Sequence, residues 1–167
     1  PMQRLNAIVI CALFFTGASH LAMAADLIEV KRMNAELAGE IAERAVLACR
    51  ENGYQVSAVV VDRGGNPQAM LRDVVASRFT NQIAEEKANA VILSGIASGE
   101  FRRNREDIRI EMNHVDGILV LDGGEPIRAA GALLGAVGVS GAPGGEKDAV
   151  CAKAAVDAVQ ERLDFAL

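Results

Sequence analysis

The fold is decided by the stretch Gln55-Val-Ser-Ala-Val-Val-Val-Asp-Arg-Gly-Gly-Asn-Pro-Gln-Ala-Met-Leu71. Residues 55–62 are rich in β-branched side chains and predict a strand. Arg63-Gly-Gly-Asn66 has the residue types of a tight turn, so residues 67–71 return as a second, antiparallel strand. The stretch therefore predicts a β-hairpin.

Three segments around the hairpin carry apolar residues at helical spacing, and these are residues 34–51, 77–94 and 146–163. Gly53 suits the left-handed cap of a helix C-terminus, and Gly95 ends the second segment in the same way. Each segment therefore predicts one helix.

Two further strands are predicted at residues 117–121 and 133–139, with Asp122-Gly-Gly-Glu-Pro126 as the turn between them. Strands joined by hairpins and flanked by helices favour an antiparallel sheet over a doubly wound one. The fold class predicted from these patterns is α+β.

Residues 99–111 interleave arginines with acidic residues. At a spacing of four residues Arg102 would pair with Glu106 and Arg103 with Asp107, as on a solvated helix. This segment is thus predicted to be a solvated helix or loop and not a basic binding patch.

Composition limits the number of domains and the kinds of partner. The 167 residues are 51% hydrophobic and 23% charged, which is typical of one globular domain with one core. The formal net charge of −5 argues against a nucleic-acid partner.

The first 24 residues have the features of a secretory signal peptide. Arg4 gives a positive start, residues 7–15 form a short apolar run, and Ala22-Met-Ala24 resembles a signal-peptidase site. We expect residues 1–24 to be removed, residues 25–167 to form a single domain, and the product to be periplasmic or secreted. The alternative is that residues 1–24 form a buried N-terminal helix. No later stretch is long and apolar enough to predict a membrane span.

Cys49 and Cys151 are the two cysteines beyond the predicted signal peptide, and each falls in a predicted helix. Export would permit a disulfide between them, but the sequence does not supply the separation of their Cα atoms. A disulfide and two buried thiols therefore both stay open. With no CxxC pair, the sequence does not resemble a zinc framework.

The motifs resemble those of the GlcG/HbpS-like family, and the resemblance extends over residues 34–163. They follow the opening helix in the order Val59-Val-Val-Asp-Arg-Gly-Gly-Asn66, Lys87-Ala88, Gly123-Gly-Glu-Pro-Ile127 and Gly135-Ala-Val-Gly-Val-Ser-Gly141. Single glycine turns are common, but four such pieces in register over one domain are more specific.

The resemblance implies a profilin-like fold, with a central antiparallel sheet of about five strands flanked by helices. It also implies a homo-oligomer and, in some members, binding of haem or related tetrapyrroles. This chain departs from the family pattern at Asn89, where relatives often carry an aromatic residue, and at Ala97-Ser98, where they often carry Pro-Thr.

Haem binding requires an apolar slot, an axial ligand or a hydroxyl near the iron, and cations for the propionates. His114 is the candidate iron ligand and Met112 a weaker one. Ser98 matches the family's hydroxyl position and either lies near an iron-bound water or makes a local cap or turn contact.

Three cations are candidates for the propionates, and these are Lys87, Arg78 and Arg102. Lys87 would either neutralise a propionate or pair with Glu85, Glu86 or another acidic neighbour. Each arginine would either grip a propionate with its guanidinium or form a solvated salt bridge.

These features favour an exported haem- or tetrapyrrole-binding protein that acts by sequestration or sensing and not by turnover. No pairing of a nucleophile with a base is recognisable, so catalytic residues stay unknown. The alternatives are a small-metabolite enzyme or accessory protein without haem, and a structural partner of another exported protein.

Overall fold

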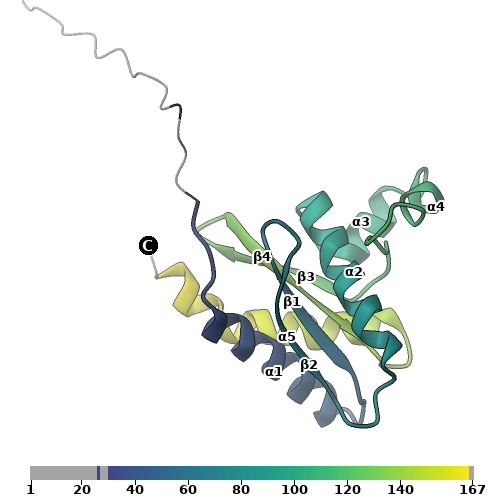
Figure 1. The fold of residues 1–167 in the computed structure, drawn as a ribbon, viewed down its shortest axis with the longest axis horizontal. Coiled ribbons are helices and arrows are strands. Elements are labelled where there is room, and N and C mark those ends of the chain that lie inside the picture. The colour runs from purple at the N-terminus through teal and green to yellow at the C-terminus, as the bar shows by residue number, and fades with distance from the viewer. Residues whose placement is uncertain (1–25, 27–29, 166–167) are drawn as a thin grey trace, which may run out of the picture.

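The computed structural model describes residue 26 and residues 30–165, so the predicted signal peptide lies outside the described residues. The strands are β1 Ser57–Asp62, β2 Pro67–Arg72, β3 Gly124–Ala129 and β4 Ala132–Ser140. The helices are α1 Ala35–Glu51, α2 Phe79–Ser94, α3 Ser98–Asn104, α4 Arg109–Met112 and α5 Gly145–Asp164 (Figure 1).

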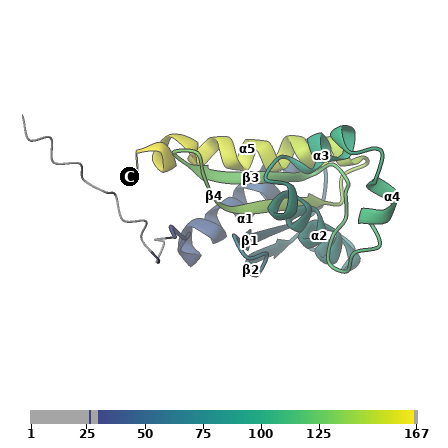
Figure 2. The ribbon, with the colours of Figure 1, turned by 90° about the horizontal axis from the view of Figure 1, so that it is seen from above.

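The four strands form one antiparallel sheet in the order β2-β1-β4-β3. Helices α1 and α5 cover one face and α2 covers the other, as Figure 2 shows. Side chains alternate along β1, so Ala58 and Val60 pack in the core under α1 and α5 while Val59 and Val61 pack under α2. The predicted α+β class is confirmed.

The hairpin and the three long helices are where the sequence predicts them. Strand β1 pairs with β2 through the Arg63–Asn66 turn, where the Asp62 carboxylate accepts hydrogen bonds from the backbone N–H groups of Gly64 and Asn66. Asn34 caps α1 by accepting from Leu37 N–H, and Gly95 ends α2 in the left-handed region.

The sheet has four strands, so the about five strands that the resemblance implied are too many by one. Residues 117–121, which the sequence predicts as a strand, do not form one. Val120 is buried there against Ala90 and Phe101, and its N–H donates to the Asn113 side chain at 2.8 Å. A short apolar run therefore packs as irregular chain against a helix, which periodicity alone does not distinguish from a strand.

The predicted turn at residues 122–126 is wrong too. Strand β3 begins at Gly124, and the hairpin turn to β4 is Ala130-Gly131, where φ is 43° and 82°. Two consecutive left-handed residues suit a two-residue hairpin. Gly124 serves a different purpose, because a Cβ at this position would lie 2.4 Å from the backbone oxygen of Lys87 in α2.

Residues 99–111 are helical only in part, since they divide between α3 and α4. Other ion pairs stand in place of the predicted Arg102–Glu106 and Arg103–Asp107 pairs. Arg102 contacts Asp122 at 3.3 Å, and Arg105 contacts Asp107 at 3.0 Å. The break between the two helices removes the spacing of four on which the predicted pairs depended.

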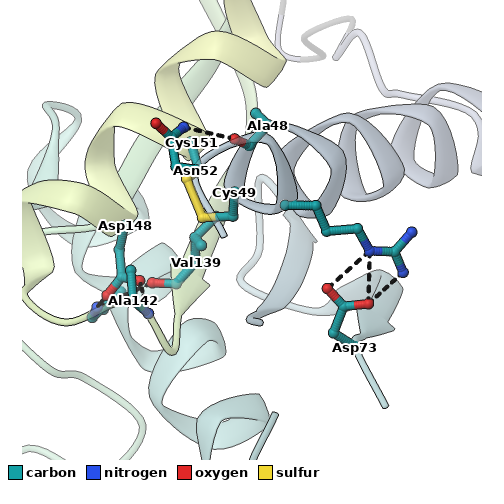
Figure 3. Close-up of a disulfide and its surroundings, with 10 residues drawn as sticks. Ala48, Cys49, Asn52, Asp73, Val139, Ala142, Asp148 and Cys151 are labelled. Atoms are coloured by element: carbon teal, nitrogen blue, oxygen red, sulfur yellow. Dashed lines mark hydrogen bonds and ion pairs between the residues drawn. A yellow bond between two sulfur atoms is a disulfide. The ribbon is translucent and has the colours of Figure 1, made fainter. Parts of the chain in front are cut away.

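Cys49 of α1 and Cys151 of α5 form a disulfide, with their Cα atoms 5.3 Å apart (Figure 3). The structure thus decides between the two states that the sequence left open. In the part of the chain that the structure describes, no helix is both long and apolar enough to cross a bilayer.

Candidate ligand-binding groove

An apolar groove lies where the end of α2 meets α3 and α4. Its volume is about 460 Å³, which is in the range of small-molecule sites. Apolar and polar side chains line it, and these are Leu93, Ser94, Ile96, Phe101, Asn104, Arg105, Ile108 and Met112.

The groove exists because the chain leaves α2 abruptly and then turns back over it. Gly95 ends α2, and Ser98 then connects the start of α3 to the start of β3. The Ser98 hydroxyl donates to Leu121 O at 2.7 Å and accepts from Gly124 N–H at 2.8 Å. Phe101, 8% exposed, packs beside the apolar groove residues Ile96 and Met112.

Arg105 is the one charged residue among those that line the groove. Its guanidinium binds both carboxylate oxygens of Asp107, at 3.0 and 3.2 Å. This hydrogen bonding raises the pKa of Arg105 and lowers that of Asp107. Both side chains are exposed, so the pair is weak and the guanidinium can turn to a ligand carboxylate.

Of the predicted iron ligands, Met112 lines the groove and His114 does not. His114 lies two residues further on, in an exposed turn where its N–H donates to Glu111 O. Its role as an iron ligand stays a prediction.

Lys87 is 1% exposed and forms a buried ion pair. Its ammonium donates to Asp148 Oδ2 at 2.7 Å and to Val139 O at 3.0 Å, and Figure 3 shows Asp148 and Val139 beside each other. Of the two roles that the sequence left open, the structure shows pairing with an acidic residue, although that residue is on α5 and not on α2.

Ser98 is buried, with its hydroxyl committed to the two backbone groups that join α3 to β3. These partners are 23 and 26 residues away, so this is a long-range contact and not the local cap or turn contact that the sequence offered. A place for the hydroxyl near an iron-bound water stays a prediction.

Arg78 and Arg102 also lie outside the groove lining. The Arg78 guanidinium stacks 4.1 Å from the centre of the Phe79 ring at the start of α2. Arg102 pairs with Asp122. Arg105 is the cation that sequence reasoning missed, and the only signal for it was its place in the arginine-rich segment.

The Asn89 side chain ties α2 to the segment that follows α4, because its Nδ2 donates to Gly117 O at 3.1 Å. Among the residues that the structure describes, no three His, Cys, Asp or Glu side chains gather as a metal-ion site.

The sheet, its helical layers and the groove define an α+β protein with an apolar recess over the end of one helix. Residues 33–157 match the family model described as Haem degrading protein HbpS-like, and the chain belongs to this family. The resemblance inferred from the motifs is confirmed.

Solved structures of the same fold include a double mutant of HbpS from Streptomyces reticuli. It is 28% identical with a TM-score of 0.75, over 93% of this chain and 99% of that chain. A second HbpS structure is 32% identical with a TM-score of 0.75, over 83% and 97%. PduOC in complex with haem is 20% identical with a TM-score of 0.66, over 77% and 95%, and shows the fold alone. No curated protein sequence matches the chain.

Proposed function

We propose that this protein is an exported haem- or tetrapyrrole-binding protein and that its ligand occupies the groove between α2, α3 and α4. The observation that carries the proposal is an apolar recess of about 460 Å³ that offers one thioether, Met112, and one guanidinium, Arg105. The family description and a haem complex of the same fold support the choice of ligand.

The groove residues fit the chemistry of haem. Leu93, Phe101 and Ile108 would cover the apolar face of the macrocycle. Met112 would offer a thioether sulfur to the iron, and Arg105 would hold a propionate in place of Asp107. Haem itself would supply an iron centre whose reactivity depends on the ligand that the protein offers and on access to solvent. His114, exposed two residues beyond Met112, is the second candidate ligand.

A hemin titration of the purified protein tests the proposal. We expect a saturable Soret shift that is weakened about tenfold, or moved in wavelength, by Met112→Ala, and weakened by Arg105→Gln. Met70→Ala is the matched control, because Met70 is an exposed methionine of β2 outside the groove. The absence of a saturable shift, or equal effects of the two methionine variants, would rule out this site.

His114→Ala in the same titration separates the two candidate ligands. A change in the wavelength of the bound spectrum with His114→Ala and none with Met112→Ala would assign the iron to the histidine. Binding without turnover predicts that the bound spectrum persists under air with a mild reductant. Steady bleaching with release of a linear product would show degradation instead.

Export is the second part of the proposal. A buried disulfide between α1 and α5 suits an oxidising compartment, because cytosolic thiols are kept reduced. The signal-like residues 1–24 agree with it. N-terminal sequencing of cellular material should find Ala25 first, and a chain that retains the leader in the cytosol would refute export.

A further inference from the structure

A second recess lies between the first hairpin turn and α2, beside the proposed haem groove. Its volume is about 300 Å³, at the lower end of the range of small-molecule sites. The Gly64-Gly65 turn, Asn89 and Ile92 of α2, and residues 116–118 line it. We call it the Asn89 recess. Leu93 separates it from the haem groove, because this side chain lines both.

The Asn89 side chain brings to this recess a buried acceptor that no described residue satisfies. Its Nδ2 donates to Gly117 O at 3.1 Å, which fixes the orientation of the amide. Its Oδ1 is buried and accepts no hydrogen bond from the residues that the structure describes. A buried oxygen without a donor costs free energy, so this site favours a ligand that carries an N–H or O–H group.

The hairpin turn faces this oxygen but has no N–H left for it. A Cβ on Gly65 would lie 3.0 Å from Asn89 Oδ1. The N–H of Gly65 donates to Asp62 O at 3.0 Å. The N–H groups of Gly64 and Asn66 donate to the Asp62 carboxylate. Because Gly65 has a φ of 83°, which favours glycine, the space in front of the Asn89 oxygen stays open.

The charges around the recess favour a cation. Asp116 lines it, is exposed, and forms no ion pair within the described part of the chain. Glu85 lies one helical turn before Asn89 on the same side of α2, and no ion pair to it is formed by the described residues either. Arg63, the cation of the hairpin turn, lines a different hollow.

Apolar side chains complete the recess, since Ile92 and Ile118 line it together with Asn89 and Asp116. We propose that the Asn89 recess binds a small organic cation, a primary ammonium with a short apolar stem. The ammonium donates to Asn89 Oδ1 and pairs with Asp116, while the stem lies against the two isoleucines. The proposal does not depend on haem, whose groove carries the guanidinium of Arg105 and repels a cation.

Isothermal titration calorimetry with n-butylammonium tests the class of ligand, and n-butanol is the matched neutral probe. We expect butylammonium to bind the purified protein with a Kd in the millimolar range, and butanol to bind at least about tenfold more weakly. The reason is that only the cation pairs with a carboxylate through charge-assisted hydrogen bonds. The absence of saturable heat from butylammonium, or equal affinities for the two probes, would overturn the proposal.

A charge reversal tests the part of Asp116. Asp116→Lys changes an exposed side chain of the recess and should weaken butylammonium binding at least about fivefold. Glu111→Lys makes the same change of charge at an exposed position of α4 that does not line the recess, so the affinity should stay near that of the wild type. An unchanged affinity in Asp116→Lys, or the same loss in both variants, would refute the pairing with Asp116.

A methyl group tests the part of the Asn89 oxygen without changing Asn89 itself. Gly65→Ala places a Cβ against Oδ1 and should abolish binding. Gly53→Ala is the matched control, because Gly53 has a similar φ of 77° but nothing within 4 Å of the added Cβ. Both variants strain the backbone alike, and urea unfolding measures that cost. Equal butylammonium affinities in the two variants would overturn the proposal.

Arg105→Gln separates this site from the haem groove. The change removes the cation of that groove and leaves the Asn89 recess untouched, so the affinity for butylammonium should not change. A gain in affinity would locate the probe in the haem groove and would refute the Asn89 recess as its site. Failure of the hemin titration leaves the prediction for butylammonium as it stands.

Discussion

Lys87 joins α2 to β4 and α5 through a buried ion pair and a hydrogen bond. It is 1% exposed, and its ammonium joins Asp148 near the start of α5 to the carbonyl of Val139 at the end of β4. Asp148 in turn accepts from the N–H of Ala142. Burial raises the pKa of the Asp148 carboxyl, and Lys87 opposes that rise.

Lys87→Met should lower the free energy of unfolding by about 3–5 kcal/mol, because it leaves the Asp148 carboxylate buried without its cation. Adding Asp148→Asn should restore most of the loss, because asparagine removes the charge and still accepts from Ala142. Urea unfolding measures both effects. Lys153→Met, which breaks the exposed pair with Asp157, is the control and should change nothing measurable. If the double variant is as unstable as Lys87→Met, a stranded charge is not the cause.

The contact between β3 and α5 contains an acid that titrates near neutral pH. Burial raises the pKa of Glu125 to about 7, with Asp157 and Glu100 adding to the rise and Lys153 opposing it. The ordinary value of 4.5 applies to the unfolded chain. The folded state therefore holds a proton that the unfolded state releases.

Glu125 should make stability fall as the pH rises from about 4.5 to about 7. Its contribution is fully present below 4.5 and is lost as the pH passes through the folded value, with a slope of at most about 1.4 kcal/mol per pH unit. Glu125→Gln should flatten the dependence in this window, and Glu43→Gln, an exposed acid of α1, should not. Urea midpoints measured across the window give the difference. Parallel curves for wild type and Glu125→Gln would contradict the assignment.

The elements that the sequence predicts well are those specified by neighbouring residues. Asn34 and Gly95 mark helix ends, and the 63–66 turn sets the first hairpin through contacts within four residues. The position of β3 was predicted wrongly because Gly124 permits a close approach of β3 to Lys87 in α2. This contact joins distant segments, whereas in the sequence the same glycine is typical of a turn.

The candidate site was predicted less well for the same reason. Met112 was found as a possible ligand, but Arg105 enters the groove only because the helix breaks between α3 and α4. Lys87 was expected to pair locally or to bind a ligand, and its partner Asp148 is 61 residues away. Helical spacing predicts on which face of its own helix a residue lies. It does not predict which distant element packs against that face.

At the scale of the whole molecule, one covalent bond holds together the two helices that cover the same face of the sheet. Cys49 and Cys151 are separated by 102 residues and are at most 1% exposed. Arg162 of α5 also contacts Glu40 of α1 at 2.6 Å, and this bond lowers the pKa of Glu40. The disulfide thus closes a loop that contains the entire sheet and α2.

Reduction of this disulfide should lower the free energy of unfolding by about 4–5 kcal/mol, because a loop of this length restricts the unfolded chain strongly. Since both sulfur atoms are buried, the native protein should react slowly with a thiol reductant and lose the bond mainly through unfolding. Urea unfolding with and without reductant, with free thiols counted at each point, measures the effect. The Cys49→Ala/Cys151→Ala variant is the control, because reductant should not move its midpoint. Fully reduced protein with an unchanged midpoint would show that the layer of α1 and α5 is held by its apolar contacts alone, and it would remove the structural support for an oxidising compartment.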